Sequence, residues 1–180
     1  MDLVTNGNEI QNYVLKICVL GDGSVGKTSL VLQYCEHKFQ ENYIMTIGSN
    51  FAVKELNLDN GKINVKVQIW DLAGQQHFQF VRPPFYRGAS GAIYVYDITR
   101  RESFENIKNW KKEADQVIAG KPFVLVGNKL DLADERVVSK SEGKKLADEL
   151  GVEFFETSAK TGESVEQIFY TLVSKIIFKK

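Results

Sequence analysis

The eight residues GDGSVGKT, at positions 21–28, constrain the fold of this chain more than any other stretch. They follow an apolar run, YVLKICVLG, and lead into a helical pattern that extends to about His37. The pattern G-x-x-x-x-G-K-[ST] between a strand and a helix is typical of a loop whose backbone N–H groups surround phosphate. A glycine-rich turn that only joins two elements is the alternative. We expect a nucleoside triphosphate site formed by Gly21, Asp22, Gly23, Ser24, Val25, Gly26, Lys27, Thr28 and Ser29.

Side chains in and near this loop predict a magnesium site. Lys27 is expected to reach the β- and γ-phosphates, and the Thr28 hydroxyl is expected to ligate Mg²⁺. Asp71 directly follows the apolar run VKVQIW, where such sites place a carboxylate that holds the ion directly or through water. Many strands end in aspartate, so Asp71 becomes informative only because the phosphate loop is present.

Strands and helices alternate along the chain, which predicts a largely parallel sheet covered by helices on both faces. Apolar or alternating segments predict strands at residues 13–21, 49–58, 62–70, 91–98, 122–128 and 152–158. Helical patterns predict helices at residues 27–37, 101–118, 139–150 and 163–177. The tripeptide DNG at positions 59–61 indicates a hairpin, and Ser139 with Glu142 indicates a capping box. The predicted fold class is therefore α/β: a three-layer α/β/α P-loop NTPase, with a six-stranded, mostly parallel sheet and one antiparallel strand.

Length and composition narrow the class of protein. A chain of 180 residues favours one domain, which we place at residues 13–178 after a polar, flexible segment at residues 1–12. Basic and acidic residues balance at 23 each, so no overall field favours nucleic acid. Cys18 and Cys35 lack metal-type spacing, and we expect buried thiols in a reducing compartment. Apolar runs fall short of the ~20 residues that span a bilayer, so a cytoplasmic protein is expected.

Two polar segments that follow predicted strands indicate the base of the nucleotide. In GNKLD, at positions 127–131, the Asp131 carboxylate can accept from both N1–H and the 2-amino group of guanine. Adenine would leave this carboxylate without a partner, which is a strong form of rejection. Asn128 and the stem of Lys129 suit the same ring. In ETSAK, at positions 156–160, Ser158 precedes an N–H of Ala159 that can donate to guanine O6, and Lys160 can cover the base. Ordinary polar loops are the alternative for each segment.

The motifs GDGSVGKT, TIG, WDLAGQ, NKLD and ETSAK occur in the order and spacing of the Ras superfamily of small GTPases, which this chain resembles over residues 13–177. The segments QIWDLAGQ, FYRGA and VYDIT resemble the Rab family within it. The resemblance implies a Ras-like G domain that binds GTP or GDP with Mg²⁺, hydrolyses GTP slowly and acts as a switch, with membrane trafficking as the expected process. It also implies a monomer whose two switch regions contact an exchange factor, a GTPase-activating protein and effectors.

The resemblance assigns roles to three residues of the first switch. Thr46 falls where the family supplies a Mg²⁺ ligand that also senses the γ-phosphate through its backbone. Phe39 falls where an aromatic ring meets the edge of guanine, and Tyr43 where a ring closes over the phosphates.

The second switch receives its roles from the same resemblance. Gln75, four residues after Asp71, matches the glutamine that orients the attacking water, and Gly74 would donate its N–H to the γ-phosphate. Gly23 occupies the phosphate-loop position where a side chain would obstruct this glutamine and an incoming arginine. Catalysis is thus assigned to Gln75, Lys27 and Thr46. Gln76 and His77 depart from the acidic and basic residues usual in the family, which bears on nucleotide exchange.

Two other classes of protein remain as alternatives. A catalytically inert GTP-binding scaffold would retain the nucleotide without turnover, although the complete set of Lys27, Thr28, Thr46, Asp71 and Gln75 argues against it. An adenine-nucleotide kinase shares the phosphate loop but conflicts with Asp131.

Three structural expectations complete the sequence-based interpretation. Because proline is tolerated only in the first helical turn, any helix in the segment 76–88 should be short and begin near Pro83 rather than before it. Arg100 and Arg101 are expected to form a solvated helix start that does not face the phosphates. The sequence ends in IIFKK without a cysteine for prenylation, so membrane attachment is expected only if a lipidated tail follows residue 180.

Overall fold

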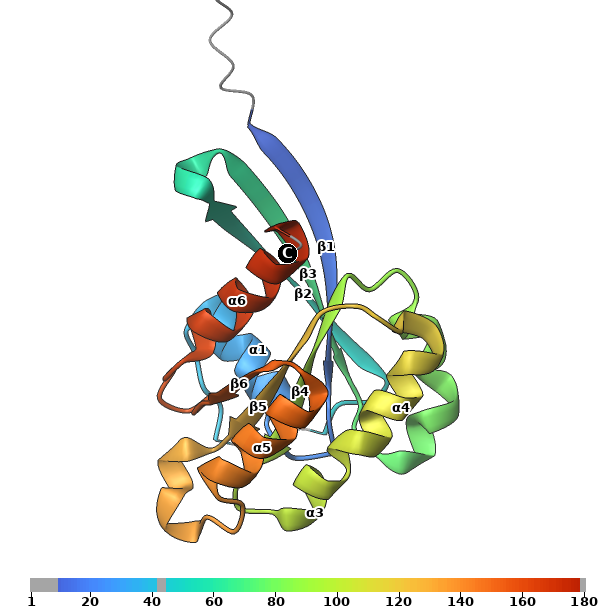
Figure 1. Ribbon diagram of the computed structural model, residues 1–180, viewed down its shortest axis with the longest axis vertical. Helices are drawn as coiled ribbons and strands as arrows, with labels where there is room; N and C mark the ends of the chain where they lie inside the picture. Colours follow the sequence, from blue (N-terminus) through green and yellow to red (C-terminus); the bar gives the residue numbers. More distant parts are fainter. Residues whose placement is uncertain (1–9, 42–44, 179–180) are drawn as a thin grey trace, which may run out of the picture.

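The computed structural model describes residues 10–41 and 45–178, and one six-stranded sheet forms its centre (Figure 1). The strand order is β2-β3-β1-β4-β5-β6; β2 and β3 are antiparallel, and the other neighbouring strands are parallel. The strands are β1 (Gln11–Leu20), β2 (Ser49–Leu58), β3 (Ile63–Leu72), β4 (Gly91–Asp97), β5 (Phe123–Asn128) and β6 (Glu153–Glu156). This arrangement confirms the predicted fold class.

Helices cover both faces of the sheet and form two apolar cores with it. The α-helices are α1 (Lys27–Glu36), α2 (Pro83–Tyr86), α3 (Arg101–Glu105), α4 (Ile107–Ile118), α5 (Lys140–Leu150) and α6 (Val165–Phe178). On one face α1 and α6 meet, where the rings of Tyr34 and Phe169 stack with their centroids 3.8 Å apart. On the other face α4 and α5 pack through residues that include Trp110 and Leu146. The cores leave the carboxyl ends of the parallel strands free for a site.

Local sequence chemistry explains the hairpin and the start of α5. The turn η1 (Asp59–Gly61) joins β2 to β3 with Leu58 opposite Ile63. Asn60 adopts a left-handed conformation there (φ 53°), which asparagine tolerates well. At α5 the Ser139 side chain accepts from the Glu142 N–H at 3.2 Å, and the Glu142 carboxylate accepts from the Ser139 N–H at 2.8 Å. Both sequence predictions are confirmed.

The first strand and the helical segment at residues 101–118 differ from their predicted bounds. β1 begins at Gln11, two residues before the predicted strand start, because Gln11 already pairs with Ile63 of β3. The single helix predicted at 101–118 is wrong, since the chain divides at Asn106 into α3 and α4. The ψ of Asn106 is −11°, and its side-chain amide donates to Asp22 Oδ2 at 2.9 Å. A contact with the phosphate loop therefore accompanies the break.

The segment that follows β3 forms two short helices rather than one. A 3₁₀ helix, η2 (Gln76–Val81), precedes α2, which begins at Pro83. The start of α2 confirms the position predicted from the prolines. The expectation that no helix begins before Pro83 is wrong, since η2 begins at Gln76.

Candidate functional site

The phosphate loop leaves β1 at Leu20 and enters α1 at Lys27. Gly26 has a φ of +96°, and a Cβ at this residue would lie 2.3 Å from Asn128 Nδ2, so a side chain does not fit. Lys27 Nζ donates to the carbonyl oxygens of Gly21 and Asp22, both at 2.7 Å. Burial lowers the pKa of Lys27 to about 8, because the buried ammonium loses its hydration. The loop therefore holds a cation that an anionic ligand would stabilise.

The three predicted metal ligands converge beside this lysine. Thr28 Oγ1 donates to Asp71 Oδ2 at 2.5 Å and lies 2.9 Å from Thr46 Oγ1, which is itself 3.4 Å from the same carboxylate oxygen. Burial raises the pKa of Asp71, and its Oδ1 is buried without a hydrogen-bond partner. Two hydroxyls and a carboxylate, with an oxygen still free to coordinate, fit the hard-oxygen preference of Mg²⁺. Within the described ranges, a cluster of three or more His, Cys, Asp or Glu side chains is absent.

Gln75 and Gly74 contact the phosphate loop from the end of β3. A Cβ on Gly23 would lie 3.3 Å from Gln75 Nε2, and a Cβ on Gly74 would lie 2.3 Å from Gly23 N. The Gln75 side chain therefore lies against Gly23, as predicted, and the backbone of Gly74 packs on the loop too closely for any side chain. Gln75 Oε1 is buried and has no hydrogen-bond partner. These residues, with Lys27, Thr28 and Thr46, line a cavity of about 20 Å³.

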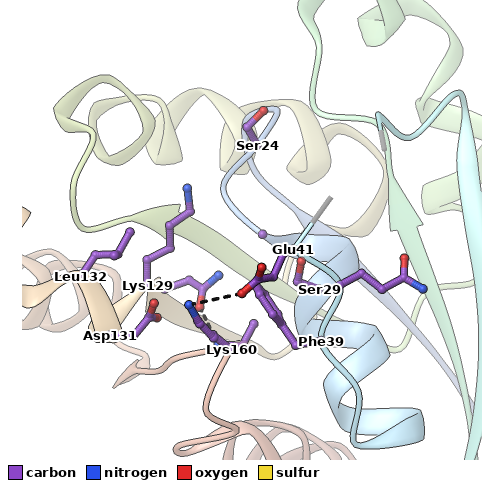
Figure 2. A pocket seen from close by; sticks show the side chains of 12 residues that line it. Ser24, Ser29, Phe39, Glu41, Lys129, Asp131, Leu132 and Lys160 are labelled. Atoms are coloured by element: carbon purple, nitrogen blue, oxygen red, sulfur yellow. Dashed lines mark hydrogen bonds and ion pairs between the residues drawn. The ribbon is translucent and has the colours of Figure 1, made fainter. Parts of the chain in front are cut away.

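A larger cavity of about 460 Å³ adjoins this one and receives both predicted base-binding segments (Figure 2). The predicted residues that line it are Ser24, Gly26, Ser29, Phe39, Asn128, Lys129, Asp131, Ala159 and Lys160. Ser24, Gly26 and Ser29 line both cavities, so the two form one continuous site.

Asn128 joins the three segments that form the base end. Its Nδ2 donates to the Val25 carbonyl at 2.9 Å, and its Oδ1 accepts from the Ala159 N–H at 3.1 Å. Contact of this N–H with guanine O6 would therefore require that it share its hydrogen between two acceptors. The buried Ser158 hydroxyl donates to Asp131 Oδ1 at 2.6 Å. The second carboxylate oxygen of Asp131 stays available to a ligand, since this bond orients the group from one side.

The structure adds residues that sequence reasoning missed. Gln40, Glu41 and Leu132 also line the larger cavity, and Glu41 pairs with Lys160 at 3.9 Å across it, as Figure 2 shows. Lys129 Nζ pairs with Asp97 Oδ2 at 2.6 Å, which fixes the lysine stem beside the cavity. Asp97 ends β4, and its position at the carboxyl end of a buried strand could have identified it.

Arg100 corrects one sequence-based expectation. Its Nη2 donates to the Gly23 carbonyl at 2.7 Å, so it contacts the phosphate loop instead of forming a solvated helix start. Its charge also opposes protonation of Lys27. Arg101 behaves as expected, because it is exposed and pairs with Glu142 at 2.6 Å. The alternation of strands and helices did not reveal that the loop after β4 turns back onto the phosphate loop.

Tyr43, predicted to close over the phosphates, lies outside the described residues. Across residues 10–41 and 45–178, none of the helices combines the length and apolar character needed to cross a bilayer.

Comparison with known proteins agrees with the fold and the motifs. The family model for the Ras family matches residues 16–178. Ras-related protein RIC1 of Oryza sativa subsp. japonica is 45% identical over 94% of this chain and 83% of its own length. Ras-related protein Rab-8B of Homo sapiens is 43% identical over 93% of this chain and 81% of its own length. GTP-binding protein ypt2 of Schizosaccharomyces pombe is 42% identical over 92% of this chain and 82% of its own length. The chain therefore belongs to the Ras family, and it is a Rab-like small GTPase of the Ras superfamily.

Proposed function

We propose that this protein is a molecular switch that binds GTP or GDP with Mg²⁺, hydrolyses GTP slowly with Gln75 as the water-positioning residue, and regulates a step of membrane trafficking. One observation carries the proposal. The oxygens of Thr28, Thr46 and Asp71 converge within hydrogen-bond distance of one another, while the Gln75 amide lies against the phosphate loop at Gly23.

Each side chain has one task at the phosphate end. Lys27 would bind the β- and γ-phosphates, which replace the carbonyls that it contacts now. Thr28, Thr46 and Asp71 would hold Mg²⁺, which when bound neutralises charge on the phosphates. Gln75 Oε1, buried without a partner, would accept a hydrogen bond from water and aim it at the γ-phosphate. We expect intrinsic hydrolysis to be slow. Phosphoryl transfer depends on positioning and charge stabilisation, and an arginine supplied by a partner typically adds about 10³–10⁵ in rate.

The base end favours guanine over adenine. The Asp131 carboxylate, oriented by Ser158, can accept from two adjacent donors of guanine. Adenine supplies an acceptor at N1 and no 2-amino group, so it would leave the carboxylate without its partners. Phe39 and the stems of Lys129 and Lys160 surround the space in which the ring would lie (Figure 2).

Switching follows from where the γ-phosphate contacts lie. Thr46 precedes β2 and Gly74 follows β3, so both switch segments would be held by the γ-phosphate and released after hydrolysis. An exchange factor, a GTPase-activating protein and effectors would bind these segments. The regulation of trafficking rests on the similarity to Rab proteins, and membrane binding would require a lipidated tail.

The test is to measure the affinities of GTP, GDP and ATP and the single-turnover hydrolysis of bound GTP. We expect GTP to bind far more tightly than ATP, and Gln75→Leu to slow hydrolysis by about 10–100-fold while nucleotide stays bound. Gln79→Leu, an exposed glutamine in the same segment, serves as the matched control and should leave the rate unchanged. Equal rates for wild type and Gln75→Leu would show that Gln75 has a different role. Tight GTP binding without hydrolysis would instead support the inert scaffold.

A further inference from the structure

Arg82 is a buried arginine that none of the sequence motifs includes. It lies between η2 and α2 and is 4% exposed. Its Nε and Nη2 donate to the two carboxylate oxygens of Glu113 in α4, at 2.8 and 2.7 Å. The same carboxylate accepts from the Tyr86 hydroxyl at 2.5 Å. Burial by itself lowers the pKa of Arg82, but the hydrogen bonds and charge of Glu113 outweigh it and leave the pKa raised. Arg82 is thus a fixed cation held on α4.

The free side of the guanidinium contacts the backbone around the catalytic glutamine. Nη1 of Arg82 donates to the carbonyl of Gln75 at 3.0 Å and to that of Ala73 at 3.2 Å. These two carbonyls flank Gly74, whose backbone packs on the phosphate loop. One planar group therefore fixes the stretch of backbone from which the Gln75 side chain projects.

The phosphate loop is fixed to the same part of α4. The Arg82 guanidinium lies over the ring of Trp110, 4.2 Å from its centroid. Trp110 Nε1 donates to Asp22 Oδ1 at 2.7 Å. Gln75 and the loop against which it lies therefore share one support, and the distance between them depends on both connections.

We propose that Arg82 is a positioning residue for GTP hydrolysis: through Glu113 and Trp110 it holds the Gln75 backbone at a set distance from the phosphate loop. This inference rests on the proposed role of Gln75. A lysine at this position would keep the positive charge but lose the planar set of donors, so it cannot hold Glu113 through two bonds and both carbonyls at once.

The experiment compares single-turnover GTP hydrolysis in wild type, Arg82→Lys, Gln75→Leu and the double variant, each loaded with GTP and Mg²⁺. We expect Arg82→Lys to slow hydrolysis by about tenfold or more, since small displacements of positioned groups have effects of this size. The GTP dissociation constant should change by less than about threefold, because the hydrogen bonds of Arg82 go to Glu113, Ala73 and Gln75, none of which is proposed to bind nucleotide. In the Gln75→Leu background, Arg82→Lys should add less than about twofold, because both changes act through one side chain.

Two further variants separate positioning from folding. Arg101→Lys alters another arginine–glutamate pair, the exposed one that Arg101 forms with Glu142, and should leave the rate unchanged. Arg82→Met combined with Glu113→Leu removes both buried charges together, which avoids an unpaired carboxylate. This protein should fold, bind GTP and hydrolyse it slowly.

The outcomes distinguish the two proposals. A wild-type rate in Arg82→Lys, or in the folded Arg82→Met/Glu113→Leu protein, would overturn the positioning role. So would an equal slowing by Arg82→Lys in the presence and absence of the Gln75 side chain, because Arg82 would then act without the glutamine. A wild-type rate in Gln75→Leu would instead contradict the proposed function itself and the positioning role that rests on it.

Discussion

The hydroxyl oxygens of Thr28 and Thr46 lie 2.9 Å apart, although 18 positions separate the residues in sequence. Thr28 lies in the first turn of α1, and Thr46 lies in the segment that leads to β2. Both hydroxyls also lie within hydrogen-bond distance of Asp71 Oδ2. Three segments thus supply one set of hard oxygen ligands, and a cation bound there would hold the first switch against the phosphate loop.

Replacing Thr46 by valine should uncouple nucleotide retention from Mg²⁺. Valine keeps the shape of the buried side chain and removes the ligating hydroxyl. We expect the slowing of GTP release by Mg²⁺ to weaken by about 10–100-fold, the range seen when a support of a metal site is lost. Release is measured with fluorescent GTP before and after chelation by EDTA. Thr171→Val, in α6, is the control, and equal Mg²⁺ dependence in both variants would argue against Thr46 as a ligand.

Enlarging Gly23 should slow hydrolysis in proportion to the added volume. A Cβ there would lie 3.3 Å from Gln75 Nε2, so alanine forces a small displacement of the glutamine and valine a larger one. We expect Gly23→Ala to reduce the single-turnover rate by a few-fold and Gly23→Val by about 100-fold, with GTP still bound. The graded pair provides its own control. Equal rates for the two variants would contradict steric displacement as the cause.

Asp131→Asn should shift base preference from guanine to xanthine. An amide can accept only one of the two guanine donors, but its NH₂ group can donate to the 2-oxo group of xanthine. We expect the ratio of XTP to GTP affinity to rise by at least about 100-fold. Competition binding measures the ratio, with Asp134→Asn, an exposed aspartate of the same 3₁₀ helix, η3 (Leu130–Glu135), as the control. An unchanged ratio of XTP to GTP affinity would show that the base does not contact Asp131.

Lys27 should make nucleotide affinity depend on pH. Its pKa in the structure is about 8, and a bound phosphate stabilises the charged form, so binding above pH 8 requires uptake of a proton. Affinity for GTP should be constant below pH 8 and fall by up to about tenfold per unit above it. Titration calorimetry between pH 7 and about 9 in buffers of different ionisation enthalpy measures this uptake. Lys27→Arg stays charged and should lose the dependence; a variant that retains it would assign the proton to another group.

The same pKa fixes the sign of a stability effect without nucleotide. Between pH 8 and pH 10.5, the ordinary pKa of lysine, the unfolded chain binds a proton at Lys27 that the folded chain has lost. The contribution of Lys27 to the free energy of unfolding therefore rises with pH through this window.

The sequence predicted the features whose chemistry is local or repeats in a fixed motif. The phosphate loop, the capping box at Ser139 and the start of α2 at Pro83 each depend on residues close together in the chain. The sheet was predicted from the alternation of strands and helices along the chain. The placement of Asp71 and Asn128 at one edge of the sheet was predicted from the rule that parallel strands place their carboxyl ends there.

Contacts between side chains far apart in sequence could not be predicted in this way. Arg82 and Glu113 are 31 positions apart, and each could equally have been a solvated charge. Arg100 illustrates the same limit, since its contact with Gly23 depends on the path of the loop after β4. The break at Asn106 escaped prediction as well, since the carboxylate of Asp22 that Asn106 contacts is distant in the sequence.

The hydrogen bond from Arg82 to the Gln75 carbonyl closes the six residues of η2 into a small ring. Phe80, at 90% exposed, stands on the outside of this ring. A protein that binds Phe80 would therefore act on a short segment that is closed by a hydrogen bond, and a displacement of this segment would be transmitted to both of its ends. One end is the buried Arg82, and the other is the Gln75 carbonyl that Arg82 holds. A partner that displaces η2 would therefore change the position of the Gln75 backbone, and with it the rate of hydrolysis, without contacting the nucleotide.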